Sequence, residues 1–136
     1  MTTILVPVSA HALPHRSPAE LLALGRRSIA DAEAVDAPSI RYAFAHLAAL
    51  RAAAAVIAVR ARPTPRGRRR ITSVWVLLTI IAPELGEWAA YFAAAACDRS
   101  AVEAGVATPT AEDADRLTEH VRRWIEVVEG AIGHGR

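Results

Sequence analysis

Cysteine is almost absent from this chain, and lysine is entirely absent. Among 136 residues the only cysteine is Cys97, which excludes an intramolecular disulfide. A lone cysteine suits the reducing cytosol, so we expect a cytoplasmic protein. Because lysine is missing, all sixteen basic side chains are arginines. This bias and the abundance of alanine suggest a GC-rich genome and say nothing of mechanism.

The chain also lacks the common motifs of catalysis and metal binding. Its seven glycines are scattered, and none has the Gly-x-Gly-x-x-Gly or P-loop spacing that binds phosphates. There is no His-Glu-x-x-His, no paired cysteine set and no Gly-x-Ser-x-Gly. His11 and His15 have the spacing of metal ligands on a helix, but their stretch is not a convincing helix and no third ligand is evident. We therefore expect neither a metal nor a cofactor.

No apolar run in the sequence has the character of a membrane span. The longest candidate covers residues 74–97, but Pro83, Glu84 and Glu87 lie in its middle, where carboxylates are costly in lipid. Residues 1–12 contain a short apolar run with no basic segment before it, so we do not expect a signal peptide. We predict that the protein has no membrane partner.

What remains is typical of a small globular domain. Apolar residues make up 53% of the chain and charged residues 22%, which argues against a disordered protein. A chain of this length can bury a core without disulfides or metals. Residues 1–16 contain two prolines and show no helical periodicity. We therefore predict an extended arm over residues 1–16 and a helical bundle over residues 17–133.

Helix start and stop signals divide the bundle into five segments. Ser17 and Glu20 fit a capping box, and Pro18 suits the first helical position. Pro83 interrupts a long apolar stretch, and Thr110 can cap the last helix. The predicted fold class is an all-α, up-and-down bundle of four to five helices, with segments at residues 17–34, 38–62, 73–82, 83–103 and 110–133.

The segment at residues 38–62 is the element around which we expect the bundle to form. One face carries a row of apolar residues: Ile40, Ala43, Phe44, Leu47, Leu50, Ala54, Ala58 and Ala61. Alanines fill much of the other side, and a helix that is apolar all round packs on more than one side. Arg51 lies inside the apolar face, where an unpaired charge is costly. We therefore expect its head to reach either an acid, with Glu84 and Glu87 as candidates, or the end of the bundle.

The aromatic residues of the third and fourth segments are predicted to lie in the core. Trp75, Trp88, Tyr91 and Phe92 belong to strongly apolar stretches, and we interpret them as core residues rather than as a ligand cage. Cys97 follows in the same pattern, so we interpret it as a small buried filler rather than as a nucleophile.

Six of the sixteen arginines fall within residues 60–70, which contain no acidic residue. They are Arg60, Arg62, Arg66, Arg68, Arg69 and Arg70. Two prolines and a glycine lie among them and predict a loop. Two interpretations stay open: a solvated basic loop, or an electrostatic binding site for RNA, DNA or an acidic protein. No aromatic residue is interleaved, so stacking on bases is not indicated.

The order of the helices and the sequence of the second resemble the HEPN superfamily of small helical bundles, and within it an actinobacterial branch. The resemblance is carried by residues 41–56, which begin Arg-Tyr-Ala-Phe-Ala-His, and by Ser-Val-Trp-Val-Leu-Leu at residues 73–78. Ala-Pro-Glu-Leu at residues 82–85 and Glu-Trp-Ala-Ala at residues 87–90 extend it. It covers most of residues 18–132.

This resemblance implies a four- or five-helix bundle, frequent dimerisation, and roles in stress or defence systems linked to nucleic acids. Many HEPN proteins are metal-independent ribonucleases with an Arg-x(4–6)-His motif, and Arg41 and His46 satisfy that spacing. In such enzymes the histidine transfers a proton at the ribose 2′-hydroxyl or the leaving oxygen, and the arginine stabilises the phosphorane charge. Two copies of the motif face each other across a dimer cleft.

The chain departs from the nuclease pattern around this motif. Tyr42 stands where the nucleases often have a polar residue, and the motif opens the second helix instead of lying late in the bundle. Five residues separate the pair by about 140° around a helix, so a second subunit or a kink would be needed to bring them together. We therefore predict a non-catalytic, homodimeric HEPN-like module that binds a protein or nucleic-acid partner in a stress- or defence-linked process. The alternative is a metal-independent endoribonuclease that uses Arg41 and His46.

Overall fold

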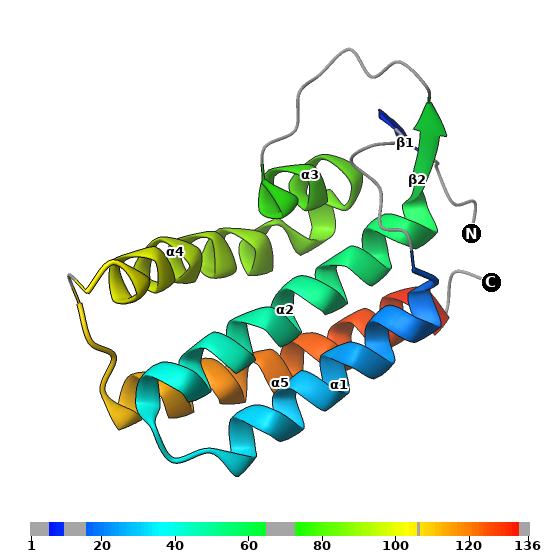
Figure 1. The fold of residues 1–136 in the computed structure, drawn as a ribbon. Coiled ribbons are helices and arrows are strands. Elements are labelled where there is room, and N and C mark those ends of the chain that lie inside the picture. The colour runs from blue at the N-terminus through cyan, green and yellow to red at the C-terminus, as the bar shows by residue number, and fades with distance from the viewer. Residues whose placement is uncertain (1–5, 10–15, 65–72, 106, 134–136) are drawn as a thin grey trace.

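The structure, a computed structural model, describes residues 6–9, 16–64, 73–105 and 107–133. Its helices follow the predicted order (Figure 1). They are α1 (Pro18–Ala34), α2 (Pro38–Arg60), α3 (Val74–Ile81), α4 (Gly86–Glu103) and α5 (Ala111–Gly133), with a 3-10 turn, η2 (Pro83–Leu85), between α3 and α4. The predicted class, an all-α bundle, is confirmed.

The starts of α1 and α5 are set by local contacts that the sequence predicts. The Ser17 hydroxyl accepts from the backbone N–H of Glu20 at 3.2 Å, and the Glu20 carboxylate accepts from the backbone N–H of Ser17 at 3.3 Å. Thr110 and Asp113 make the same reciprocal pair at the start of α5, at 3.0 Å each. Both predicted caps are therefore confirmed, and each satisfies backbone donors that a helix start leaves unpaired.

A short pair of strands accompanies the helices. β1 (Val6–Ser9) and β2 (Ala61–Thr64) run parallel, with Val6 opposite Ala61 and Ser9 opposite Thr64. We expected the second helix to continue to residue 62 and a loop to follow, which is wrong at this point: the helix ends at Arg60, and the next four residues form β2. The division of the chain at residue 16 stays a prediction.

Helix α2 lies in the middle of the bundle, as predicted (Figure 1). α1 and α5 run along one side of it, and α3 and α4 cover another. The side of α2 that faces these neighbours is lined by fully buried alanines, Ala45, Ala48, Ala49, Ala52 and Ala53. Small side chains let neighbouring helices approach closely, which explains why the alanine-rich sequence suits this position.

The burial of α2 is nevertheless one-sided. Ile40 is 50% exposed, and Phe44, Leu47 and Leu50 on the same stripe are only partly buried. The helix thus carries apolar residues on every side, but neighbouring helices do not cover every side. Among the described residues, α2 is also the one helix with the length and composition to cross a membrane, but 56% of that window is buried inside the bundle, as in the core helix of a soluble protein.

An aromatic cluster joins α3, α4 and α5 in the core. The ring of Phe92 is fully buried, and its centroid lies 5.2 Å from that of Trp75 and 5.7 Å from that of Trp124. Trp124 is fixed in turn, because its indole N–H donates to the carbonyl of Ala49 on α2 at 3.1 Å. The predicted core role is confirmed for Trp75 and Phe92, whereas Trp88 and Tyr91 are only partly buried and pack against the core. The prediction for Cys97 is wrong, since this cysteine is exposed on α4.

Candidate functional site

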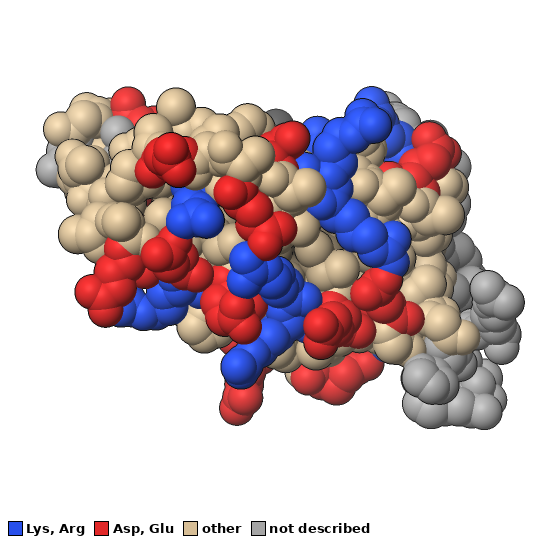
Figure 2. All heavy atoms as spheres, turned by 90° about the horizontal axis from the view of Figure 1, so that it is seen from below, with Lys and Arg blue, Asp and Glu red and all other residues tan. Residues whose placement is uncertain are grey.

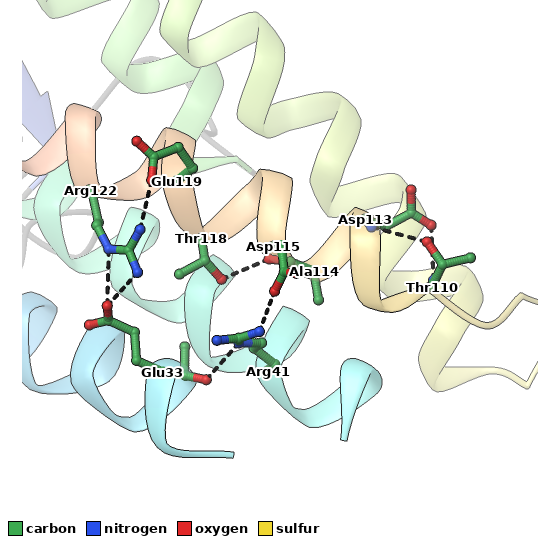
Figure 3. A network of polar contacts seen from close by, with 10 residues as sticks. Glu33, Arg41, Thr110, Asp113, Ala114, Asp115, Thr118, Glu119 and Arg122 are labelled. Carbon is green, nitrogen blue, oxygen red and sulfur yellow. Dashed lines mark hydrogen bonds and ion pairs between the residues drawn. The ribbon is translucent and has the colours of Figure 1, made fainter. Parts of the chain in front are cut away.

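Arg41 lies at the start of α2 and is held within its own chain. Its Nε donates to the carbonyl of Ala32, near the end of α1, at 3.0 Å. Its guanidinium also forms an ion pair with Asp115 on α5 (Figure 3). The side chain is only 25% exposed. Arg41 therefore ties together three helices, and both of its contacts use nitrogen atoms that a phosphate would need.

His46 lies one and a half turns further along α2 and is 2% exposed. Its ring meets the ring of Trp75 on α3 edge-on, with centroids 6.2 Å apart. Arg41, by contrast, is directed at α1 and α5. The structure therefore places the two motif residues on different sides of α2, as their spacing predicts, and does not bring them together within one chain.

The basic segment at residues 60–70 is described only at its start. Arg60 forms an ion pair with Glu84 in η2, and its side chain is 20% exposed. Burial, the largest single effect, raises the pKa of the Glu84 carboxyl, but the hydrogen bond and charge of Arg60 and a backbone hydrogen bond together outweigh burial and lower that pKa. The backbone of Arg62 belongs to β2. The remaining predicted residues, Arg66, Arg68, Arg69 and Arg70, lie outside the described residues.

The pairing of Glu84 with Arg60 also corrects an expectation about Arg51. Glu84 and Glu87 were the acids that we expected Arg51 to reach if its head did not lie at the bundle end, but among the described residues no ion pair joins Arg51 to either carboxylate. Arg51 is partly buried, and its β-carbon lies against Gly25 on α1. Its stem thus packs on a neighbouring helix, as long basic side chains commonly do.

The face formed by α1 and α5 carries both signs of charge. Figure 2 shows arginines and acids interleaved over this face. Arg26 pairs with Glu129, and Arg122 pairs with both Glu33 on α1 and Glu119 on its own helix (Figure 3). The hydrogen bond from Arg122 to Glu33 raises the pKa of that guanidinium further. Because the arginines are matched by neighbouring carboxylates, this face offers no patch of one sign to a polyanion.

A pocket of about 450 Å³ opens beside the start of α2, where α4 and α5 approach it. Its walls include Tyr42, Tyr91, Leu117 and two alanines, and residues 107–109 border it. Asp98, Asp113 and Arg116 bring charges to it. We did not predict this pocket from the sequence. The feature of the sequence that could have indicated it is the presence of two aromatic residues with a polar hydroxyl, Tyr42 and Tyr91, in segments that are otherwise rich in alanine.

The two tyrosines present neutral hydroxyls to the pocket. Tyr42 is 7% exposed, and its hydroxyl donates to the carbonyl of Ala95 at 3.5 Å. Burial, with a smaller contribution from Asp98, raises the pKa of Tyr42 to about 12. Burial also raises the pKa of Tyr91, with Arg116 opposing the shift and Asp98 adding to it. Both rings therefore stay uncharged throughout the physiological range.

His120 fixes the orientation of Tyr91. Its Nδ1 lies 2.8 Å from the carbonyl oxygen of Arg116 and 3.2 Å from the Tyr91 hydroxyl. Since a carbonyl can only accept, we assign the proton to Nδ1 from the shorter contact. The rings of His120 and Tyr91 also lie 4.6 Å apart. Tyr91 is thus held by α5, and its ring forms a fixed wall of the pocket.

Some of the charged side chains around the pocket have partners of opposite charge and others do not. Arg116 lies 3.3 Å from Glu112 and 3.6 Å from Asp113, so its charge is shared with two carboxylates. Asp113 is also the capping partner of Thr110. Asp98 makes no hydrogen bond or ion pair with any other described residue. Within the part of the chain that the structure describes, Asp98 is therefore the carboxylate of the pocket whose charge is not paired.

No cluster of three or more histidine, cysteine, aspartate or glutamate side chains close enough to hold a metal ion occurs among the residues that the structure describes. The expectation that the protein needs no metal or cofactor stays a prediction.

Comparison with known proteins places the chain in a family. No curated protein and no solved structure matches it. The model of the HEPN_SAV_6107-like HEPN family matches residues 32–129, which include α2, α3 and α4 entirely and most of α5. This match covers well over half of the sequence and agrees with the observed helical bundle. The chain therefore belongs to the HEPN_SAV_6107-like HEPN family.

Proposed function

We propose that this HEPN protein is a non-catalytic binding module that engages a polyanionic partner, a nucleic acid or an acidic protein, through residues 60–70. The observation that supports the proposal best is the state of the nuclease-like motif. Arg41 is occupied by Asp115 and by the Ala32 carbonyl, and His46 is 2% exposed. General acid–base catalysis requires a histidine within hydrogen-bond reach of the substrate, which a buried ring does not offer.

The distribution of charge supports the choice of surface. Residues 60–70 hold six arginines and no acid, whereas the other ten arginines of the chain stand against fourteen acids. The rest of the chain therefore has a formal charge of −4, and a polyanion would be attracted only to the basic segment. We propose that the protein acts in the cytoplasm, in a stress- or defence-linked process.

Fluorescence anisotropy with a labelled single-stranded RNA, recorded in EDTA over a range of salt concentrations, tests this proposal. Replacing Arg66, Arg68, Arg69 and Arg70 with alanine should weaken binding. It should also reduce the slope of the logarithm of the binding constant against the logarithm of the salt concentration by up to about 0.7 per lost phosphate contact. A control that removes Arg27 and Arg123, two exposed arginines of α1 and α5, should change both little. Identical binding by the segment variant would remove residues 60–70 as the binding surface.

The same samples distinguish the alternative, a metal-independent ribonuclease. That activity would require the Arg41–Asp115 pair to open and His46 to become accessible. We expect the RNA to stay intact in EDTA. Degradation by the wild-type protein that stops in His46→Ala would establish the enzyme instead.

We also propose that the module is a homodimer. The partly exposed apolar stripe of α2 supports this, because contiguous exposed apolar surface commonly marks an interface. Light scattering coupled to gel filtration should give twice the chain mass of 14.5 kDa. Ile40→Glu, which places a charge on the most exposed residue of the stripe, should shift the protein toward monomer. A wild-type monomer at every concentration would contradict the dimer.

A further inference from the structure

The pocket between α2, α4 and α5 has the size and lining of a small-molecule site. Its volume of about 450 Å³ falls within the range of known ligand pockets, about 300–1,000 Å³. Its walls are apolar and aromatic, from Tyr42, Tyr91 and Leu117. Polar side chains make up much of the remaining lining, namely Asp98, Thr108, Asp113 and Arg116. Polar groups at fixed places beside apolar surface give a ligand one orientation.

The charged side chains of the pocket determine whether it favours a cationic or an anionic ligand. Arg116 is already shared between Glu112 and Asp113, at 3.3 and 3.6 Å, so it offers little to an anion. Asp98 has no partner among the described residues, and it lies near enough to both tyrosines to influence their hydroxyls. An anion would meet an unpaired carboxylate here, whereas a cation would neutralise it.

The ring of Tyr91, which is only partly buried, adds a second reason to favour a cation. The face of an aromatic ring attracts a cationic group within about 6 Å of its centroid. A guanidinium group is planar, so it can lie against a ring while its N–H groups fork onto a carboxylate. Tyr91 is fixed by His120, which lets the pocket keep this shape without a ligand.

We propose that this pocket binds an organic cation, with a guanidinium group on an apolar stem as the head group that fits best. Asp98 receives the guanidinium, Tyr42 and Tyr91 provide the aromatic walls, and Leu117 contacts the stem. The group can come from a free small molecule or from an arginine side chain of a protein partner, since both carry the same chemistry. The site is separate from the basic segment and does not depend on the proposed RNA binding.

Calorimetric titration of the full chain with three matched small molecules tests the proposal. n-Butylguanidinium has the proposed head and stem, n-butylurea has nearly the same shape without the charge, and pentanoate has the opposite charge. We expect saturable binding of n-butylguanidinium, at least tenfold weaker binding of n-butylurea, and none of pentanoate. Equal binding of the guanidinium and the urea, or no binding of either, would overturn the proposal.

Two variants of the protein locate the site. Asp98→Asn keeps the size of an exposed side chain, so the fold should be retained, and it should weaken guanidinium binding by about tenfold. Asp31→Asn makes the same change at an exposed position of α1 that is outside the pocket and should leave binding unchanged. Equal weakening in both variants, or in neither, would contradict the assigned site.

A peptide arm separates the two sources of the group. A blocked Gly-Arg-Gly peptide and the same peptide with citrulline in place of arginine are titrated alongside the small molecules. Tighter binding of the arginine peptide than of n-butylguanidinium assigns the pocket to a protein partner. Binding of n-butylguanidinium without the peptide assigns it to a free small molecule. With only two tyrosines in the chain, ring-current shifts of the ligand protons and of the tyrosine protons report contact directly.

Discussion

Arg41 should stabilise the bundle, and its removal provides a direct test of the contacts seen around it. The Nε hydrogen bond to the Ala32 carbonyl is partly buried and has a charged donor, a type that contributes about 1.5–3 kcal/mol. The ion pair with Asp115 is more exposed, since the Asp115 side chain is 59% accessible, and such pairs contribute about 0–1 kcal/mol. We therefore expect Arg41→Ala to lower the free energy of unfolding by about 2 kcal/mol.

The assay is urea unfolding followed by tryptophan fluorescence, which reports on the buried aromatic cluster around Trp124. The midpoint should fall in Arg41→Ala while the slope with urea stays unchanged, because the same surface is exposed on unfolding. Asp115→Ala should cost about 0.5 kcal/mol, and the double variant should show that part of the effect is shared.

Arg27→Ala is the matched control, since Arg27 is an exposed arginine of α1 with no ion pair among the described residues. It should change the free energy of unfolding by less than about 0.5 kcal/mol. If Arg41→Ala behaves like Arg27→Ala, the contacts of Arg41 do not hold the helices together. Arg41 would then not be structurally occupied.

Three further predictions follow from the core, the caps and the buried hydroxyl. Phe92→Ala removes a fully buried ring and should cost about 3–5 kcal/mol in urea unfolding; a loss below about 1 kcal/mol would place Phe92 outside the core. Thr110→Ala removes the cap of α5 and should cost about 1 kcal/mol, whereas Thr110→Ser should restore it. Because the pKa of Tyr42 is raised from 10.0 to about 12, the folded state holds its proton more tightly than the unfolded state does. The contribution of the Tyr42 hydroxyl to the free energy of unfolding should thus be fully present below pH 10 and be lost between pH 10 and 12. Tyr42→Phe should make the fall in stability over this range less steep, and an equally steep fall in that variant would contradict the assignment.

The order and ends of the helices could be predicted because they are set by contacts within a few residues. Ser17 with Glu20 and Thr110 with Asp113 make their caps three residues apart. Pro83 stops α3 because proline disfavours the helical conformation of the residue before it. Such signals need no knowledge of the rest of the chain.

Features that depend on distant partners could not be predicted. β2 exists because it pairs with β1, more than fifty residues earlier, and nothing within residues 61–64 demands it. Cys97 directly follows four alanines, at residues 93–96, and alanine is found on both the buried and the exposed face of α4, so this run did not show which face Cys97 takes. The ion pair of Glu84 depends on how Arg60 leaves the end of α2.

The candidate sites show the same division. Spacing alone predicted that Arg41 and His46 diverge, and the structure places them on different sides of α2. The pocket, by contrast, is assembled from Tyr42, Asp98 and Arg116, which lie on three helices far apart in the sequence. Its negative charge follows from the pairing of Arg116 with two neighbouring carboxylates, which only the folded chain reveals.

The burial of His46 is the point on which the non-catalytic account depends most directly. Reaction of the native protein with diethyl pyrocarbonate, followed by mass spectrometry of its peptides, measures whether this ring is accessible. The account predicts that His46 is unmodified in the folded protein and modified fully once urea unfolds it, because the ring is 2% exposed. Modification in the folded protein at a rate close to that of the unfolded chain would show that His46 is accessible and contradict the account.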